Sequence, residues 1–372
     1  MSARRGLIGV GIGVAAAGAA TAAGVATERV LRSRRRRVGT PSPPDDPELE
    51  QRGSVVVADD GVPLYVEIEE PTGAAKDPGS PRGIGGSKRG RTSWGRATVL
   101  LVHGYAHSHA IWAQQRRDIT GAGYRVVCVD LRGHGRSGEG DDASYTIAQL
   151  GRDLAAVIEQ TTPTGPIALV GHSMGGMALM ALAEQRSQVV RDRVVGVALI
   201  STSAGGMSEV DFGLGRQLGG VVHRLGPAAV ARADKRPQTF NAARLLGRNV
   251  ESALVHRYSF GGPVPKDVIR EVAEMIFGTR LHVIGAFLPT LIEHDREAAL
   301  PVFDGIETLI VHGTRDRMTP IAHGERLARS LQGAELVVVK GAGHVLPLES
   351  PELVSAELLA FLERAERSVV DR

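Results

Sequence analysis

Short apolar runs alternate with amphipathic segments along most of the chain, which predicts a sheet covered by helices. Continuous apolar runs are typical of strands buried on both faces, and they lie at residues 98–102, 125–129, 167–170, 194–200, 308–311 and 336–339. Apolar residues at helical spacing fall between or after them, at residues 146–160, 174–184 and 351–368. This alternation indicates an α/β fold with a mainly parallel sheet and helices on both faces.

A predicted hairpin and a loop precede and interrupt this pattern. Residues 55–57 and 64–68 flank the turn Asp59-Asp60-Gly61, which is typical of a β-hairpin. Residues 71–96 are crowded with Gly, Pro, Ser and basic residues, and we expect a disordered loop there. The core is therefore expected to comprise residues 53–204 and 301–372.

The alternation stops between residues 205 and 300. Helical patterns recur at 268–277 and 281–292, separated by Gly and Pro, and no strand pattern accompanies them. An insertion of helices between two strands of a sheet would lie over the sheet. We expect residues 205–300 to form a helical cap.

The N-terminal residues 1–38 combine an apolar stretch with a basic flank, and residues 39–52 read as a linker rich in Pro and Asp. No charge occurs from Gly6 to Thr27, which is long enough to cross a bilayer but consists mostly of Ala and Gly. A membrane anchor, a signal peptide and a surface helix remain open. Arg4-Arg5 resembles a twin-arginine export signal, whereas the cluster from Arg32 to Arg37 favours a membrane-associated protein with a cytoplasmic catalytic domain.

Charge is distributed unevenly along the chain. The net charge is +3, yet residues 1–38 carry many arginines and only one acid, Glu28, so the remainder is net acidic. The folded part thus lacks the basic footprint of a nucleic-acid-binding protein, and we expect no nucleic-acid partner. The single cysteine, Cys128, lies in an apolar run and is expected to be a buried core thiol.

The sequence Gly171-His172-Ser173-Met174-Gly175-Gly176 follows an apolar strand and precedes a helix. In that context G-x-S-x-G indicates a nucleophile elbow, in which Ser173 is exposed at the apex of a tight, strained turn. Gly171 and Gly175 lack side chains that would clash where the strand and the helix cross. We therefore expect Ser173 to be a catalytic nucleophile.

A serine nucleophile needs a base, and the base needs an acid that fixes its tautomer. His344 follows the last predicted strand and Asp316 follows the one before it, in the order Ser, Asp, His that this elbow type uses. Each alone is equally compatible with a turn or capping residue. Asp295 and Asp304 do not follow a strand and are weaker candidates, and four histidines of the predicted cap are expected to be surface or packing residues: His223, His256, His282 and His294.

An oxyanion formed at Ser173 needs two hydrogen-bond donors. The backbone N–H of Met174, at the positive end of its helix, is one candidate. The loop His103-Gly104-Tyr105 after the strand at residues 98–102 offers the backbone N–H of Tyr105 as the other. His103 is expected to orient this loop. No metal or cofactor is required by this set of residues.

Together these motifs, with Asp130-Leu131-Arg132-Gly133-His134-Gly135-Arg136-Ser137 after the second strand, resemble the α/β-hydrolase superfamily from about Val55 to the C-terminus. The chain looks most similar to the branch of esterases and cofactor-free haloperoxidases with a helical cap. Related epoxide hydrolases and dehalogenases use an aspartate where this chain has Ser173, so the resemblance disfavours those activities. Arg136-Ser137 is expected to stabilise its loop.

The resemblance implies a serine hydrolase that cleaves a hydrophobic carboxylic ester, as an esterase or lipase does, through an acyl-enzyme. C–C bond hydrolysis, thioester hydrolysis and haloperoxidase or perhydrolase chemistry would use the same triad. A non-catalytic ligand receptor on a hydrolase fold is the alternative of another class. The substrate itself is not readable from the pattern, because a cap shapes the pocket.

Overall fold

The computed structural model describes residues 53–72, 96–210 and 248–370. The expectations for residues 1–38 and 39–52, and for nearly all of the loop at 71–96, therefore lie outside the described residues. The predicted hairpin is present as β1 (Gly53–Val57) and β2 (Pro63–Glu69), joined by a turn in which Gly61 adopts a φ of 88°.

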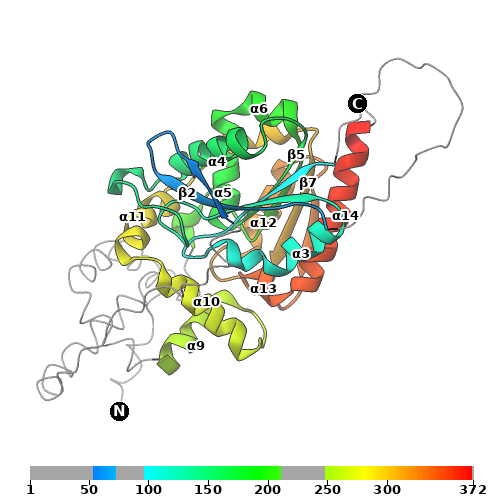
Figure 1. Cartoon of the computed structure of the whole chain (residues 1–372). Helices are drawn as coiled ribbons and strands as arrows, with labels where there is room; N and C mark the ends of the chain where they lie inside the picture. Colours follow the sequence, from blue (N-terminus) through cyan, green and yellow to red (C-terminus); the bar gives the residue numbers. More distant parts are fainter. Residues whose placement is uncertain (1–52, 73–95, 211–247, 371–372) are drawn as a thin grey trace, which may run out of the picture.

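Within the described residues eight strands form one sheet, in the order β1-β2-β4-β3-β5-β6-β7-β8. Figure 1 shows this sheet with helices around it. The six later strands are β3 (Thr98–Val102), β4 (Arg125–Val129), β5 (Ile167–His172), β6 (Val194–Ile200), β7 (Glu307–Gly313) and β8 (Glu335–Val339). All pairs from β4 to β8 are parallel, whereas β2 pairs antiparallel with both β1 and β4. The expected mainly parallel sheet is confirmed, and each predicted run forms a strand. The last of them, β8, lies at the edge of the sheet and is only partly buried.

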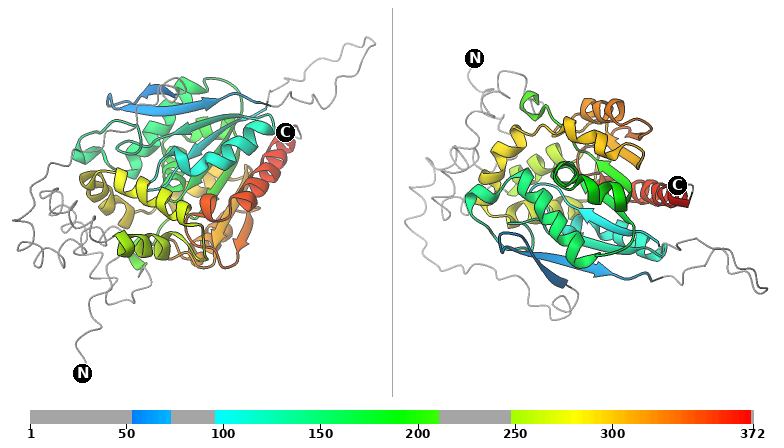
Figure 2. Two further views of the ribbon diagram at one scale, coloured as in Figure 1. Left: turned by 60° about the horizontal axis from the view of Figure 1, so that its bottom comes forward. Right: turned by 90° about the horizontal axis from the view of Figure 1, so that it is seen from above.

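Helices cover both faces of the sheet (Figure 2). In β3, Leu100 and Val102 pack on one face, and Val99 and Leu101 on the other, because successive side chains of a strand alternate. The first face is covered by α4 (Ile147–Thr161), α5 (Met174–Gln185), α6 (Ser187–Arg193) and α12 (Ile321–Ser330). The second is covered by α3 (Ala113–Gly121), α13 (Leu346–Glu349) and α14 (Pro351–Val370).

Among the described residues, the α-helices between β6 and β7 in sequence are α9 (Arg248–Ser259), α10 (Lys266–Gly278) and α11 (Leu281–Ile292). We call these the cap helices; α10 and α11 coincide with the two predicted helical patterns. Within the described ranges no single helix is long and apolar enough to cross a membrane, and α10 with α11 would qualify only as a pair bent by 92°.

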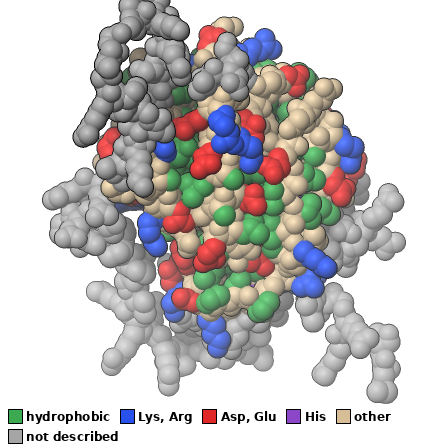
Figure 3. All heavy atoms as spheres, turned by 90° about the vertical axis from the view of Figure 1, so that its right-hand side faces the viewer, with side chains coloured by type: hydrophobic (Ala, Val, Ile, Leu, Met, Phe, Trp, Pro, Cys, Tyr) green, Lys and Arg blue, Asp and Glu red, His purple; other side chains and the backbone are tan. Residues whose placement is uncertain are grey.

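Charged side chains are mixed with apolar ones on the described part of the face at the right-hand side of Figure 1 (Figure 3). Ion pairs also tie the terminal helix to the sheet. Arg364 of α14 donates from Nε to the Glu307 carboxylate of β7, at 2.6 Å, and from Nη2 to Glu335 of β8. Such partly exposed pairs contribute little to stability individually.

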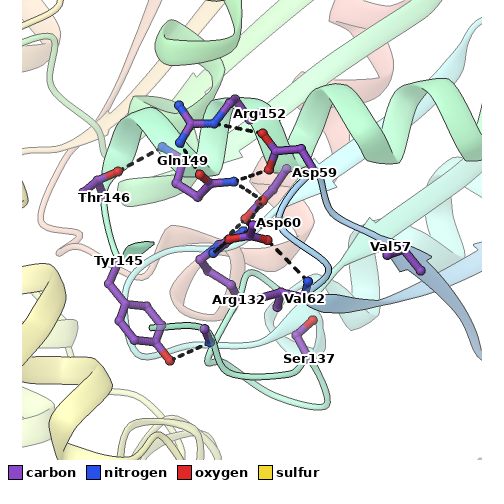
Figure 4. Close-up of polar contacts among 12 residues, drawn as sticks. Val57, Asp59, Asp60, Val62, Arg132, Ser137, Tyr145, Thr146, Gln149 and Arg152 are labelled. Atoms are coloured by element: carbon purple, nitrogen blue, oxygen red, sulfur yellow. Dashed lines mark hydrogen bonds and ion pairs between the residues drawn. The ribbon is translucent and has the colours of Figure 1, made fainter. Parts of the chain in front are cut away.

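A buried guanidinium fastens the hairpin to the core. Arg132, in the loop after β4, has no exposed surface and makes two hydrogen bonds to Asp153 of α4, at 2.7 and 2.6 Å. It also makes two to Asp60 of the hairpin turn, at 2.6 and 3.0 Å (Figure 4). Gln149 of α4 adds a hydrogen bond to Asp59, at 2.6 Å. The turn between β1 and β2 is thereby held against α4.

Removing Asp153 is expected to be much more harmful than removing Asp60. Asp153→Ala leaves a buried guanidinium with one half-exposed partner, which should reduce the free energy of unfolding by about 3–5 kcal/mol. Asp60→Ala removes a carboxylate whose side chain is 34% exposed, and should cost about 1 kcal/mol. Urea unfolding of both variants, with Glu363→Ala in the exposed Arg367 pair as control, measures the difference. Equal losses of unfolding free energy for Asp153→Ala and Asp60→Ala would contradict the view that Asp153 is the main partner of the buried Arg132.

Candidate active site

Ser173 stands between β5 and α5 in a strained backbone conformation, with φ 52° and ψ −120°. Its amide donates to the carbonyl of Ile200 in the neighbouring strand β6, at 2.9 Å. A Cβ on Gly175 would lie 2.4 Å from the Val102 carbonyl oxygen, and one on Gly171 would lie 2.6 Å from the Gly176 nitrogen. The tight turn therefore requires glycine at both positions, for the steric reason expected from the sequence.

Three strand ends bring Ser173, His344 and Asp316 together. The Ser173 Oγ lies 2.9 Å from His344 Nε2, and His344 Nδ1 lies 2.8 Å from Asp316 Oδ2. Asp316 follows β7 by three residues and His344 follows β8 by five, while Ser173 directly follows β5. The three side chains of the expected triad thus form one continuous hydrogen-bonded chain.

Asp316 sets the direction of hydrogen-bond donation within this triad. Its Oδ1 accepts hydrogen bonds from the amides of Met318 and Thr319, at 2.8 and 2.9 Å, and its Oδ2 accepts one from Thr319 Oγ1, at 2.8 Å. Burial alone would raise the pKa of Asp316, but the charge and hydrogen bond of His344 lower it. Because an ionised carboxylate only accepts, His344 Nδ1 carries the proton and Nε2 is free to accept one from Ser173.

Thr319 and His312 support Asp316, and neither is identified by the sequence pattern. Thr319 Oγ1 also lies 3.0 Å from the Ser201 carbonyl oxygen, and its own carbonyl accepts from His312 Nε2, at 2.6 Å. Burial lowers the pKa of His312, so this histidine acts as a neutral donor. The one available signal was that Thr319 follows Asp316 by three residues, within reach of the same carboxylate.

The loop that carries His344 is fastened to the end of the cap helix α9. The amides of His344 and Val345 both donate to the Ser259 carbonyl, at 3.0 and 2.9 Å. The Glu349 carboxylate accepts from three further amides, those of Gly343, Gly261 and Gly262, at 2.7, 3.0 and 2.8 Å. The backbone position of His344 therefore depends on the cap as well as on the sheet.

The loop after β3 passes directly against the nucleophile. A Cβ on Gly104 would lie 2.9 Å from the Ser173 Cβ, so this position admits no side chain. Tyr105, whose amide is a candidate oxyanion donor, directs its hydroxyl to the Ile284 carbonyl of α11, at 2.5 Å. Met174, the other candidate donor, is the first residue of α5, where backbone N–H groups have no partner within the helix.

His103 orients this loop. Its Nε2 accepts a hydrogen bond from the Leu131 amide, at 2.9 Å, so Nδ1 must carry the proton and donates to the Gly104 carbonyl, at 2.7 Å. Burial lowers the pKa of His103 to about 4, which keeps the ring neutral and this tautomer populated. The structure thus agrees with the role expected for His103.

His109, which follows the same loop in sequence, belongs to a network of charged side chains with Asp130 and Glu67. Asp130 Oδ1 accepts from the amide and from Nδ1 of His109, at 2.7 and 2.9 Å, and Oδ2 accepts from the Arg136 amide, at 2.8 Å. Glu67 lies 3.2 Å from His109 Nε2. Burial alone would lower the pKa of His109, but its hydrogen bonds to Asp130 and Glu67 raise it to about 9. His109 is therefore a cation at neutral pH.

The remaining candidates do not join the site. The His256 ring packs at a tilt against Phe260, His282 lies 3.1 Å from Glu139, and His294 bonds the Ser203 carbonyl, while His223 lies outside the described residues. Asp304 is exposed, and Asp295 is exposed and its backbone pairs with that of Gly205.

Cys128 is buried, and burial raises the pKa of its thiol. In the part of the chain that the structure describes, no cluster of three or more His, Cys, Asp or Glu side chains is placed to hold a metal ion.

A mainly parallel sheet with a strained serine elbow and a hydrogen-bonded Ser–His–Asp triad at the carboxyl ends of its strands defines the class of α/β hydrolases. The family model described as the alpha/beta hydrolase fold matches residues 97–351. The chain belongs to this family, as the motifs indicated.

Individual relatives are distant. A putative carbamate hydrolase of Variovorax paradoxus, RutD, is 28% identical over 72% of this chain and 91% of that protein. A thermophilic esterase of Thermogutta terrifontis has a TM-score of 0.61 at 23% identity, covering 84% of this chain and 99% of that one. A bromoperoxidase of Bacillus anthracis has a TM-score of 0.62 at 19% identity, with coverages of 84% and 99%. The two structural likenesses establish a shared fold.

The charge on His109 is expected to make stability fall in mildly alkaline solution. Its pKa is about 9 when folded and about 6.5 when unfolded, so the stabilisation is complete below pH 6.5 and is lost as the pH rises towards 9. The loss should be roughly 3 kcal/mol at most. Urea unfolding at intervals from pH 6 to pH 10 measures it. His109→Gln should remove this pH dependence. If the stability of the variant and of the wild type fell in parallel with pH, His109 would not be the group responsible.

Proposed function

We propose that this chain is a serine hydrolase that cleaves carboxylic esters through an acyl-enzyme. One observation carries the proposal: the hydrogen-bonded chain from Ser173 Oγ through His344 to Asp316, at 2.9 and 2.8 Å, with the serine in a strained turn. These distances are within the range in which a base can remove the proton of a nucleophile.

In the proposed acylation step, the Ser173 Oγ attacks the ester carbonyl while its proton moves to His344 Nε2. The carbonyl oxygen becomes an oxyanion, stabilised by the backbone N–H groups of Tyr105 and Met174. When the tetrahedral intermediate collapses, the bond to the alcohol oxygen breaks and His344 returns the proton to that oxygen. Asp316 stays ionised throughout and stabilises the imidazolium.

Deacylation repeats these steps with water as the nucleophile. His344 Nε2 takes a proton from water, the resulting hydroxide attacks the acyl carbonyl, and the same two amides stabilise the oxyanion. Collapse of the second intermediate breaks the bond to Ser173 Oγ, which regains its proton from His344. No other reactant is required.

The surroundings of the triad favour an apolar ester. Ala106 follows Tyr105 and Val345 follows His344, and both belong to one buried hydrophobic cluster. The cap helices and the segment after α9 supply the other buried members, which are Val255, Phe260, Val272 and Ile276. An apolar cluster that includes the chain neighbours of Tyr105 and His344 suits a hydrophobic acyl or alcohol moiety better than a charged one.

Thioester, C–C bond and perhydrolase chemistry, together with a receptor function without turnover, are the competing proposals. A panel of p-nitrophenyl esters of increasing acyl length separates enzyme from receptor and reports the preferred chain length. An acyl-CoA thioester, a 1,3-diketone and peracid formation from acetate with hydrogen peroxide, run in parallel, distinguish the reaction types.

Ser173→Ala is expected to abolish p-nitrophenyl ester hydrolysis and labelling by a fluorophosphonate probe, because it removes the hydroxyl that His344 is placed to deprotonate. Ser203→Ala is a suitable control, since Ser203 is a buried serine that bonds His323 away from the triad, at 2.8 Å. It should keep labelling and activity. A labelled peptide containing a serine other than Ser173 would refute the proposal.

Asp316→Asn should lower kcat by roughly two to four orders of magnitude while the fold is retained. The new amide keeps the hydrogen bonds at Oδ1 but presents N–H groups to His344 Nδ1, which favours the tautomer with its proton on Nε2. That tautomer cannot accept the proton of Ser173. Steady-state kinetics are measured alongside Asp304→Asn and Asp295→Asn, which should change kcat little. A dead Asp295 or Asp304 variant beside an active Asp316→Asn would place the acid elsewhere.

A further inference from the structure

His172 is a buried histidine that the proposed mechanism does not use. It is the last residue of β5, directly before Ser173, and its side chain has no exposed surface. Its Nε2 lies 2.9 Å from the carbonyl oxygen of His344. Because a carbonyl only accepts, Nε2 must carry the proton and donate. Burial, followed by the nearby His344, lowers the pKa of His172 well below its usual value, so the ring is neutral.

The packing around this ring leaves it no freedom to turn. Its centroid lies 5.0 Å from that of His344, 5.7 Å from that of His107 and 6.5 Å from that of Trp112. A Cβ on Gly104 would come within 2.8 Å of its Nδ1, and this nitrogen has no hydrogen-bond partner among the described residues. The imidazole therefore makes one hydrogen bond, and that bond is to the backbone of the proposed base.

Two consecutive residues thus bind the same histidine. Ser173 Oγ is hydrogen-bonded to the side chain of His344, and His172 Nε2 donates to the His344 carbonyl. On the other side of the residue, the amide of His344 is held by Ser259. The bond from His172 is a direct hydrogen bond from the elbow to the backbone of His344. Without it, the bonds from Ser259 and Asp316 would still hold this residue, but the only hydrogen bond between the elbow and His344 among the described residues would be that of Ser173 Oγ.

We propose that His172 is a positioning residue, which holds the backbone of His344 in register with Ser173 by donating from Nε2 to the His344 carbonyl. The inference rests on the proposed function. Its role lies in acylation and deacylation alike, since both need the same distance between base and nucleophile. Substrate binding does not depend on it, so its loss lowers kcat more than it raises KM.

Two substitutions of similar length test the donor. His172→Met fills the space without a donor, and His172→Gln places an amide N–H close to the former Nε2. His172→Met should lower kcat about 10- to 100-fold with KM within about twofold, the size expected for one lost hydrogen bond that acts on alignment. His172→Gln should recover most of that loss. The low-field proton resonance of His344 Nδ1–H should broaden or move in His172→Met and return in His172→Gln.

His294 provides a matched control. It is also buried and bonds a backbone carbonyl through Nε2, that of Ser203, at 3.0 Å. His294→Met should lower thermal stability by an amount similar to His172→Met but leave kcat and the low-field resonance unchanged. If His172→Met proves insoluble, His172→Asn replaces it, because its shorter amide cannot reach the His344 carbonyl.

The outcomes separate the two proposals. Equal kcat values and equal resonances for the Met, Gln and wild-type proteins, with Ser173→Ala inactive, overturn the role of His172 and leave the function intact. An equal loss in the Met and Gln variants also overturns it, because the hydrogen-bond donor would then not matter. Full activity in Ser173→Ala overturns the proposed function itself.

Discussion

The hydrogen bond from His344 Nδ1 to the Asp316 carboxylate is the interaction on which the proposed roles of Ser173 and His344 depend. With the proton fixed on Nδ1, Nε2 is left as an acceptor facing Ser173, 2.9 Å from its Oγ. The bond survives burial because Asp316 accepts from two amides and a hydroxyl as well. An ionised carboxylate without those donors would be costly in the same place.

Backbone strain is concentrated along that edge. The described residues other than glycine with positive φ are Ala106, Ser173 and Ser201, which follow β3, β5 and β6. Each such conformation costs on the order of 1–3 kcal/mol and persists only where the surroundings enforce it. Each of these turns follows a strand that is paired on both edges, and loop anchors such as His103 and Asp130 fix the residues nearby. A rigid, buried sheet therefore supports loops that would not keep these shapes alone.

The sequence predicts this architecture well where a local pattern carries the information. Buried strands have continuous apolar runs, and the elbow has glycines at fixed spacing, so both are readable. Helices α3 and α12 were not predicted, because α12 buries only Gly324 and Leu327 and α3 buries chiefly Gln115, Ile119 and Thr120. His172, Thr319 and Glu349 act through contacts made in three dimensions; of these, Glu349 bonds Gly261, which is 88 residues away. The hydrophobic periodicity of a sequence predicts helices and strands, but it does not predict contacts between such distant residues.

The attachment of the cap to the loop of His344 has a consequence for engineering. By sequence, the helical insertion ends near residue 300, and a graft that replaced the whole insertion would appear to leave the core untouched. Yet Ser259 supplies the acceptor for the amides of His344 and Val345, and Gly261 and Gly262 occupy two of the three amide positions that Glu349 binds. A chimera intended to exchange specificity should therefore keep the parental segment from Ser259 to Gly262 and place its junctions on either side of it.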